Sequence, residues 1–144
     1  MKLSLQTDYA LRTLIYAAYR NERITIADVA EFYGISRPHV AKVVNLLSKH
    51  GFLRSIRGIG GGVEIARPVD GISVGEVIQC SEGKTHLLDC VSQKNICVIE
   101  QFCKLKSVLA EAERIQLDFL MNQSIADMLP RRREIVQLQT VASE

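Results

Sequence analysis

The sequence predicts a mainly α-helical fold with one small β-hairpin and a long helix near its C-terminal end. Apolar residues recur at helical spacing through roughly the first fifty residues. Two short β-type runs flank the glycine-rich residues 58–62, and a helical apolar stripe extends over residues 101–121. The 144 residues can bury one core of ordinary size and leave room for an oligomerisation element.

Two helices are expected first, at residues 5–19 and roughly 26–33. The first places apolar residues at helical spacing from Leu5 onward. The second should begin with a capping box, because Thr25 and Asp28 have the required spacing.

A third helix, from Ser36 to about His50, separates its residues by face. Ser36 is expected to be its N-cap, and Gly51 is placed to end it in the left-handed conformation. One stripe is apolar and consists of Val40, Val43, Val44 and Leu47. The opposite side carries Pro38, Lys42, Asn45 and Lys49. Two helices joined by a glycine-containing turn, the second with a basic outer face, are typical of a helix-turn-helix.

Residues 52–57 and 63–66 should form the two strands of a hairpin. A hairpin directly after a recognition helix is typical of a winged helix-turn-helix. Arginines on such a wing suit phosphate or minor-groove contacts, and glycines at its tip let the backbone approach DNA closely. The residues expected to contact DNA are Ser36, Arg37, His39, Lys42 and Asn45 on the helix, and Arg54, Arg57 and Gly60 on the wing.

The distribution of charge supports this assignment. Residues 1–67 carry ten Lys/Arg against five Asp/Glu, whereas the remaining residues carry eight against eleven. A basic half joined to an acidic half suits a DNA-binding head on a separate regulatory body. We divide the chain into four predicted parts. They are the winged helix-turn-helix (1–67), a connecting helix and cysteine loop (68–103), a dimerisation helix with a final helical turn (104–130), and a disordered tail (131–144).

The second half should contain two further helices. Ser73 and Glu76 form a capping box for a short helix to about Cys80, followed by an aperiodic stretch over residues 81–102. The apolar stripe of residues 101–121 is long for so small a head, so we expect this helix to pair with its copy in a homodimer. A last turn should be capped by Ser124 and Asp127.

Three of the four cysteines, Cys90, Cys97 and Cys103, lie within fourteen residues in the aperiodic stretch. Thiolates are soft ligands that suit iron–sulfur clusters and zinc, and three are one short of the usual four. His86 is placed to complete a zinc site of three cysteines and one histidine, although the spacing lacks a Cys-x2-Cys knuckle. Cys80 is another possible ligand, but it ends an apolar helix and is expected instead to be a packed thiol without a metal.

Several other classes of function are disfavoured by the sequence. The glycine-rich run lacks the ending of a P-loop and links two strands, where a nucleotide-binding loop joins a strand to a helix. No Ser/His/Asp set and no Cys-x2-Cys redox pair is found, so the chain is not expected to be an enzyme. No apolar run is long enough to span a membrane and no secretory signal is present, so a cytoplasmic location is expected.

Two segments and the cysteine triad together resemble the Rrf-type winged-helix repressors over about residues 1–130. The segments are Met1-Lys2-Leu3 continuing to Thr7-Asp8-Tyr9-Ala10-Leu11-Arg12, and Arg57-Gly58-x-Gly60-Gly61-Gly62. The resemblance implies a homodimer on a palindromic operator, and a 4Fe–4S cluster, in preference to a 2Fe–2S cluster or zinc, on Cys90, Cys97 and Cys103.

The fourth ligand distinguishes the branches of this family. The iron–sulfur-biogenesis branch uses a histidine three residues after the last cysteine, where this sequence has Lys106. The nitric-oxide-sensing branch (NsrR) uses an aspartate in the first helix, donated by the partner subunit, and Asp8 stands at the matching place. The resemblance therefore implies a repressor that leaves DNA when nitric oxide reacts with its cluster. An iron-responsive (RirA-type) or general redox regulator of the same family, and a zinc-stapled DNA-binding protein, remain alternatives.

Overall fold

The computed structural model describes residues 2–131 and 134, and it consists of a compact head with a projecting helical arm. The head contains three helices and a two-stranded antiparallel hairpin: α1 (Leu5–Arg20), α2 (Ile26–Tyr33), α3 (Arg37–Lys49), β1 (Leu53–Ile56) and β2 (Gly62–Ile65). The mainly helical fold with a winged helix-turn-helix is confirmed. The predicted tail, residues 131–144, lies outside the described residues except for Arg131 and Glu134.

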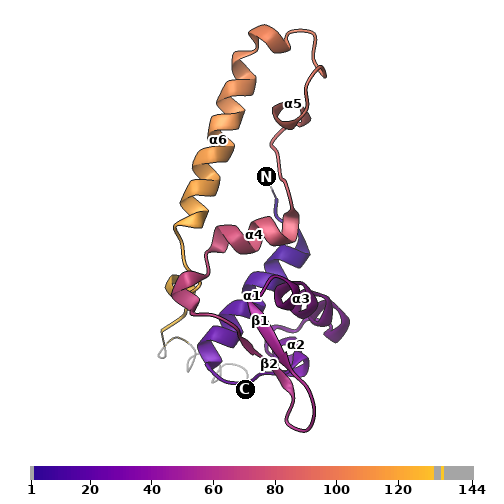
Figure 1. Ribbon diagram of the computed structural model, residues 1–144, viewed down its shortest axis with the longest axis vertical. Coiled ribbons are helices and arrows are strands. Elements are labelled where there is room, and N and C mark those ends of the chain that lie inside the picture. The colour runs from indigo at the N-terminus through magenta and orange to yellow at the C-terminus, as the bar shows by residue number, and fades with distance from the viewer. Residues whose placement is uncertain (1, 132–133, 135–144) are drawn as a thin grey trace.

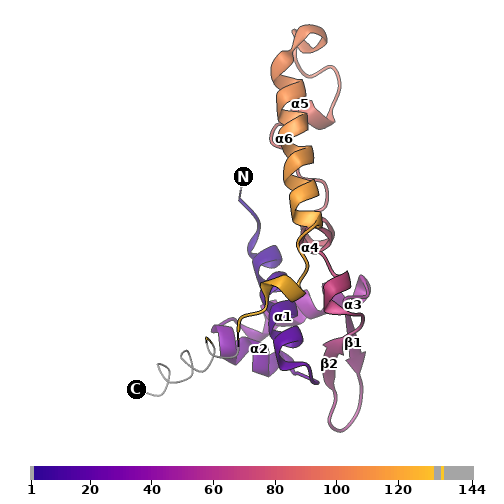
Figure 2. The ribbon, with the colours of Figure 1, turned by 90° about the vertical axis from the view of Figure 1, so that its left-hand side faces the viewer.

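The helix α4 (Val74–Glu82) packs against α1 and adds a fourth helix to the head, and the projecting arm is built from α5 (Asp89–Ser92) and α6 (Lys104–Met121). The chain leaves α4, climbs past α5 to the far end of the arm, and returns along α6 to the head (Figures 1 and 2). Three short 3₁₀ turns complete the described part of the chain, at Val69–Gly71, Glu100–Phe102 and Ala126–Met128. The helix predicted from residue 101 thus begins at Lys104, because the preceding turn is 3₁₀.

Local capping explains where several helices begin. Both predicted capping boxes are present: Thr25 with Asp28 at α2, and Ser73 with Glu76 at α4. Ser36 occupies the N-cap position of α3 as expected, but its side chain makes no capping hydrogen bond. Its hydroxyl lies 2.9 Å from Nδ1 of His39 instead.

The core of the protein lies almost wholly in the head. The predicted apolar stripe of α3 is buried, as are Leu14 and Phe52. By contrast, none of the residues of α5 or α6 is buried in the single chain. Exposed apolar residues on α6 include Leu105, Val108, Ile115 and Phe119.

Backbone hydrogen bonds join the arm to the head. Val74 N–H donates to the Gln123 carbonyl and Ile125 N–H donates to the Ile72 carbonyl, each over 2.8 Å. Gly75 packs against the end of α6 so closely that an added Cβ would lie 2.8 Å from the Met121 backbone nitrogen. We call this region, residues 72–75 with 121–125, the joint.

Candidate functional site: a DNA-binding face and a cysteine segment

The outer face of α3 is exposed and polar. All five residues predicted to contact DNA from this helix and its cap are exposed: Ser36, Arg37, His39, Lys42 and Asn45. Lys42 and Asn45 lie opposite the buried apolar stripe, so packing of that stripe onto α1 turns them outward. The Tyr9 ring, from α1, lies 6.0 Å from the His39 ring between centroids.

The three wing residues predicted to contact DNA differ in how free they are to do so. Arg57 is exposed beside the tip, and Gly60 has a φ of 72°, a left-handed conformation that favours glycine. Arg54 faces Glu64 across the hairpin, and its Nε donates to that carboxylate over 3.2 Å. Of the two wing arginines, Arg57 is therefore the freer to meet DNA.

The three clustered cysteines occupy different positions along one segment. Cys90 lies in α5, Cys97 is exposed in the loop, and Cys103 is the N-cap residue of α6. All three are free thiols. Within the part of the chain that the structure describes, no three His, Cys, Asp or Glu side chains are grouped closely enough to hold a metal ion.

As a set of donors, these thiols nevertheless suit a soft metal centre. They lie in a segment without buried residues, so few packing contacts oppose their convergence. The segment also exposes apolar side chains, with Val98 and Phe102 at 102% and 85% exposure. The residues present therefore fit a cluster chemically, and the segment must close for all three to bind one.

Asp8 lies in the first turn of α1, away from the buried face. Its carboxylate accepts a hydrogen bond from Arg12 Nε over 2.9 Å and its side chain is 41% exposed. The Arg12 guanidinium in turn lies 5.7 Å from the centroid of the Tyr33 ring, at the end of α2. In this chain the structure does not bring Asp8 together with the three cysteines.

Glu82, at the end of α4, was not singled out by the sequence. Its carboxylate accepts hydrogen bonds from the Ser4 backbone N–H over 2.6 Å and from the Thr7 hydroxyl. These bonds, the one from Thr7 first, lower the pKa of the Glu82 carboxyl. Because Asp8 follows Thr7, Glu82 ties the helix leading into the cysteine segment to the turn that carries Asp8.

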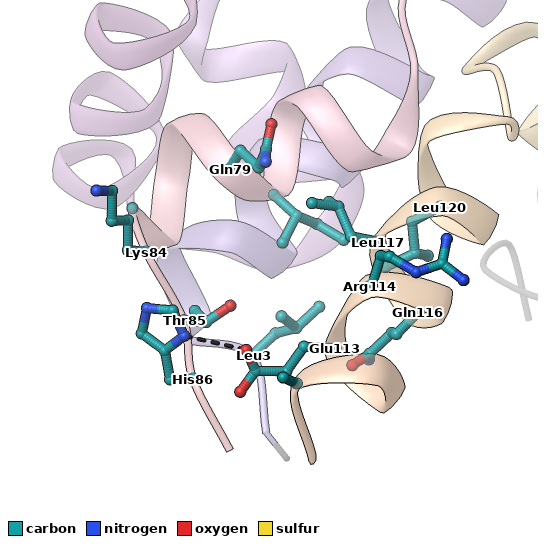
Figure 3. Close-up of a pocket in the computed structure, with 13 residues that line it drawn as sticks. Leu3, Gln79, Lys84, Thr85, His86, Glu113, Arg114, Gln116, Leu117 and Leu120 are labelled. Atoms are coloured by element: carbon teal, nitrogen blue, oxygen red, sulfur yellow. Dashed lines mark hydrogen bonds and ion pairs between the residues drawn. The ribbon is translucent and has the colours of Figure 1, made fainter. Parts of the chain in front are cut away.

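His86 is held by α6 and not by the cysteines. Its Nδ1 lies 3.0 Å from Oε2 of Glu113 (Figure 3). The other oxygen of that carboxylate accepts a hydrogen bond from the Leu87 N–H over 2.5 Å. These bonds, chiefly the one from Leu87, lower the pKa of the Glu113 carboxyl. The pair borders a groove of about 680 Å³ between α4 and α6 that also includes Leu3, Ile78 and Leu117.

Cys80 lies apart from the triad, on α4. It packs against the core cluster, and burial, followed by the nearby Glu76 carboxylate, raises the pKa of its thiol. A raised pKa disfavours the thiolate that metals bind. This environment fits the expected packed thiol.

Among the described residues, no helix combines the length and the apolar character needed to cross a membrane.

Comparisons with known proteins agree with this architecture. The family model described as "Rrf2: Iron-dependent Transcriptional regulator" matches residues 3–131. The chain is 38% identical to the HTH-type transcriptional regulator NsrR of Bacillus licheniformis, over 96% of this chain and 99% of that one. It is 37% identical to the NsrR of Bacillus subtilis, over 96% and 97%.

Solved structures show the same fold. T. potens IscR aligns with a TM-score of 0.71 and 27% identity, over 89% of this chain and 85% of that one. The oxidised form of Staphylococcus aureus CymR aligns with a TM-score of 0.72 and 25% identity, over 91% and 98%. The relatives named NsrR are transcriptional regulators, which confirms that the chain is a regulator and not an enzyme. The chain belongs to the Rrf2 family of DNA-binding transcriptional regulators.

Proposed function

We propose that this chain is a cytoplasmic, homodimeric repressor that senses nitric oxide through a 4Fe–4S cluster and then releases a palindromic operator. Cys90, Cys97 and Cys103 would bind three irons, and Asp8 of the partner subunit would bind the fourth. Ser36, Arg37, His39, Lys42 and Asn45 would contact the operator from α3, and Arg54, Arg57 and Gly60 from the wing.

One observation carries the proposal. Three free thiols share a single segment that contributes nothing to the core, in a chain 37–38% identical to two proteins named NsrR. A segment without packing of its own gains order from a ligand, which couples its shape to that ligand. A 4Fe–4S cluster, when bound, supplies iron that reacts with nitric oxide.

The assignment of Asp8 to the partner subunit rests on its exposure and on α6. Among the described residues, the Asp8 side chain pairs with one partner, Arg12, which is itself exposed. Such pairs contribute little to stability, so Asp8 can exchange Arg12 for an iron at small cost. The exposed apolar stripe of α6 provides the surface through which two chains would meet.

If the bond between Asp8 and the iron broke, Asp8 would again form the ion pair with Arg12 that is seen in this structure. Arg12 lies over Tyr33, which ends α2 one residue before the turn at Gly34. A change at Asp8 would therefore reach the helix-turn-helix through two neighbouring side chains. Because a dimer tolerates little error in half-site spacing, a small shift of either head would weaken operator binding.

The test uses protein purified without oxygen. We expect a brown protein with about four irons per chain, whose visible absorption and operator affinity both fall on nitric-oxide titration. Cys97→Ser should lose the colour and Cys80→Ser should keep it. Asp8→Ala should alter the nitric-oxide response, whereas Asp70→Ala, which removes an exposed acid from another turn, should not.

Other outcomes point elsewhere. A colourless protein holding one zinc per chain contradicts the cluster. A brown protein that leaves DNA on iron chelation but ignores nitric oxide supports the iron-responsive alternative, which agrees with the words "iron-dependent" in the family description.

A further inference from the structure

The wing has a third strand-like neighbour that the sequence did not indicate. Ile24, between α1 and α2, pairs with Val63 of β2 as an isolated antiparallel bridge. The Ile24 N–H donates to the Val63 carbonyl over 2.9 Å, and the Val63 N–H donates back over 2.8 Å. Both side chains are buried, so the base of the wing is fixed to the head.

Arg23, the residue before Ile24, extends this attachment to the tip of the wing. Its Nη1 donates to the Gly60 carbonyl over 2.8 Å. Its Nη2 lies 4.0 Å from Oε1 of Glu64, in the middle of β2. The guanidinium therefore spans the wing from strand to tip, a reach that its planar set of donors allows.

The fit around Arg23 is close. An added Cβ on Gly62 would lie 2.4 Å from the Ile24 carbonyl oxygen and 3.1 Å from Cγ of Arg23. Glycine at residue 62 thus lets the arginine lie flat along the hairpin. This gives Gly62 a role apart from DNA contact.

Within the tip itself, the Gly61 N–H donates to the Gly58 carbonyl over 3.0 Å. Gly58 and Gly60 both have positive φ, and Ile59 is fully exposed. In the part of the chain that the structure describes, Arg23 provides the side-chain hydrogen bond that reaches residues 57–61 from outside the wing. Arg54 does not share this role, because its guanidinium donates to Glu64 on the neighbouring strand and not to the tip.

We propose that Arg23 is a positioning residue for the wing. It holds the glycine tip, and with it Arg57, at the angle from which the wing meets DNA, and it makes no phosphate contact of its own. This inference rests on the DNA binding that the Rrf2 family carries out. It does not depend on the cluster or on nitric oxide.

The test compares Arg23→Ala with Arg20→Ala. Arg20 has similar exposure and pairs with Glu22, away from the wing. The probe is a duplex selected from a random library by the wild-type protein. For Arg23→Ala we expect affinity to fall on the order of five- to tenfold, the size of the net contribution of one ordinary hydrogen bond. The slope of log affinity against log salt should not change.

Hydrogen exchange in the free protein provides a second measurement that needs no DNA. Amides of residues 57–62 should exchange faster in Arg23→Ala than in Arg20→Ala, with unfolding midpoints matching within a few degrees. Arg23→Lys keeps a hydrogen-bond donor and the positive charge, so it should recover part of the DNA affinity and part of the protection from hydrogen exchange. It also replaces Arg23→Ala in both measurements if Arg23→Ala fails to fold.

Three results would overturn the proposal. A salt slope reduced by about one in Arg23→Ala would make Arg23 a phosphate contact. Unchanged affinity together with unchanged exchange would show that the wing holds its position without this arginine. Unchanged exchange with weakened binding would also exclude a positioning role. If the wild-type protein selected no DNA from the library, the proposed repressor function would be contradicted. The hydrogen-exchange rates of residues 57–62 would then still decide whether Arg23 positions the wing.

Discussion

The head and the arm of this molecule are organised in opposite ways. The head buries a continuous core, whereas α5 and α6 bury none of their residues in the single chain. Yet the arm holds the three clustered cysteines and a long apolar stripe. The head thus buries its apolar residues within one chain, whereas the arm leaves an apolar surface exposed, as surfaces that meet other molecules do.

The largest expected difference between the two regions is in stability. Leu14→Ala removes a fully buried side chain from the head and should lower the free energy of unfolding by about 3 kcal/mol, measured by urea denaturation. Phe119→Ala, on the exposed stripe of α6, is the matched change in the arm. It should lower the unfolding midpoint only at concentrations where the chains associate. An equal, concentration-independent loss in both variants would refute the contrast.

The joint offers an intermediate effect. Gly75→Ala should cost about 1–3 kcal/mol, because the new methyl group would meet the Met121 backbone nitrogen and Sδ at 2.8 Å. Gly71→Ala is the control, since a Cβ there meets nothing within 4 Å, and it should change stability by less than about 0.5 kcal/mol. If both variants unfold at the same urea concentration, the arm is not packed on the head as described.

The smallest expected effect concerns the tie from Glu82 to α1. Glu82→Gln should destabilise the protein by about 0.5–1 kcal/mol at neutral pH, a modest value because the site is near solvent. The folded pKa of this carboxyl lies below its ordinary 4.5, so its contribution is complete above that pH. The contribution is lost as pH falls through the lowered value.

Unfolding of wild type and Glu82→Gln at several pH values would measure this. The difference between the two proteins should shrink in acid. A difference that stays constant down to acid pH would show that the carboxylate charge is not what holds Ser4 and Thr7.

Much of the head could be predicted because its determinants are local. Capping boxes span four residues, and the buried stripe of α3 follows from its 3.6-residue period. Ser36 shows the limit even there: its place at the N-cap was predicted, but His39 competes for its hydroxyl.

The contacts that the sequence did not indicate are those between distant residues. Thr7 meets Glu82 across 75 positions, and Arg23 meets Gly60 across 37. The single turn of α5 is too short to show a periodicity. The arrangement of the cysteines could not be derived either, because residues 83–103 have neither a clear periodicity nor a buried side chain that would fix their positions.

The length of α6 has a mechanical consequence. At 18 residues it is about 27 Å long, so a rotation of about 5° at the joint displaces its far end by about 2 Å. The reverse also holds: a small movement of the cysteine segment turns the base of the helix by only a few degrees. A displacement at the far end of α6 therefore becomes a much smaller displacement at its base. In the proposed dimer, a signal that entered at the far end would therefore pass better directly to the neighbouring head than back down its own helix.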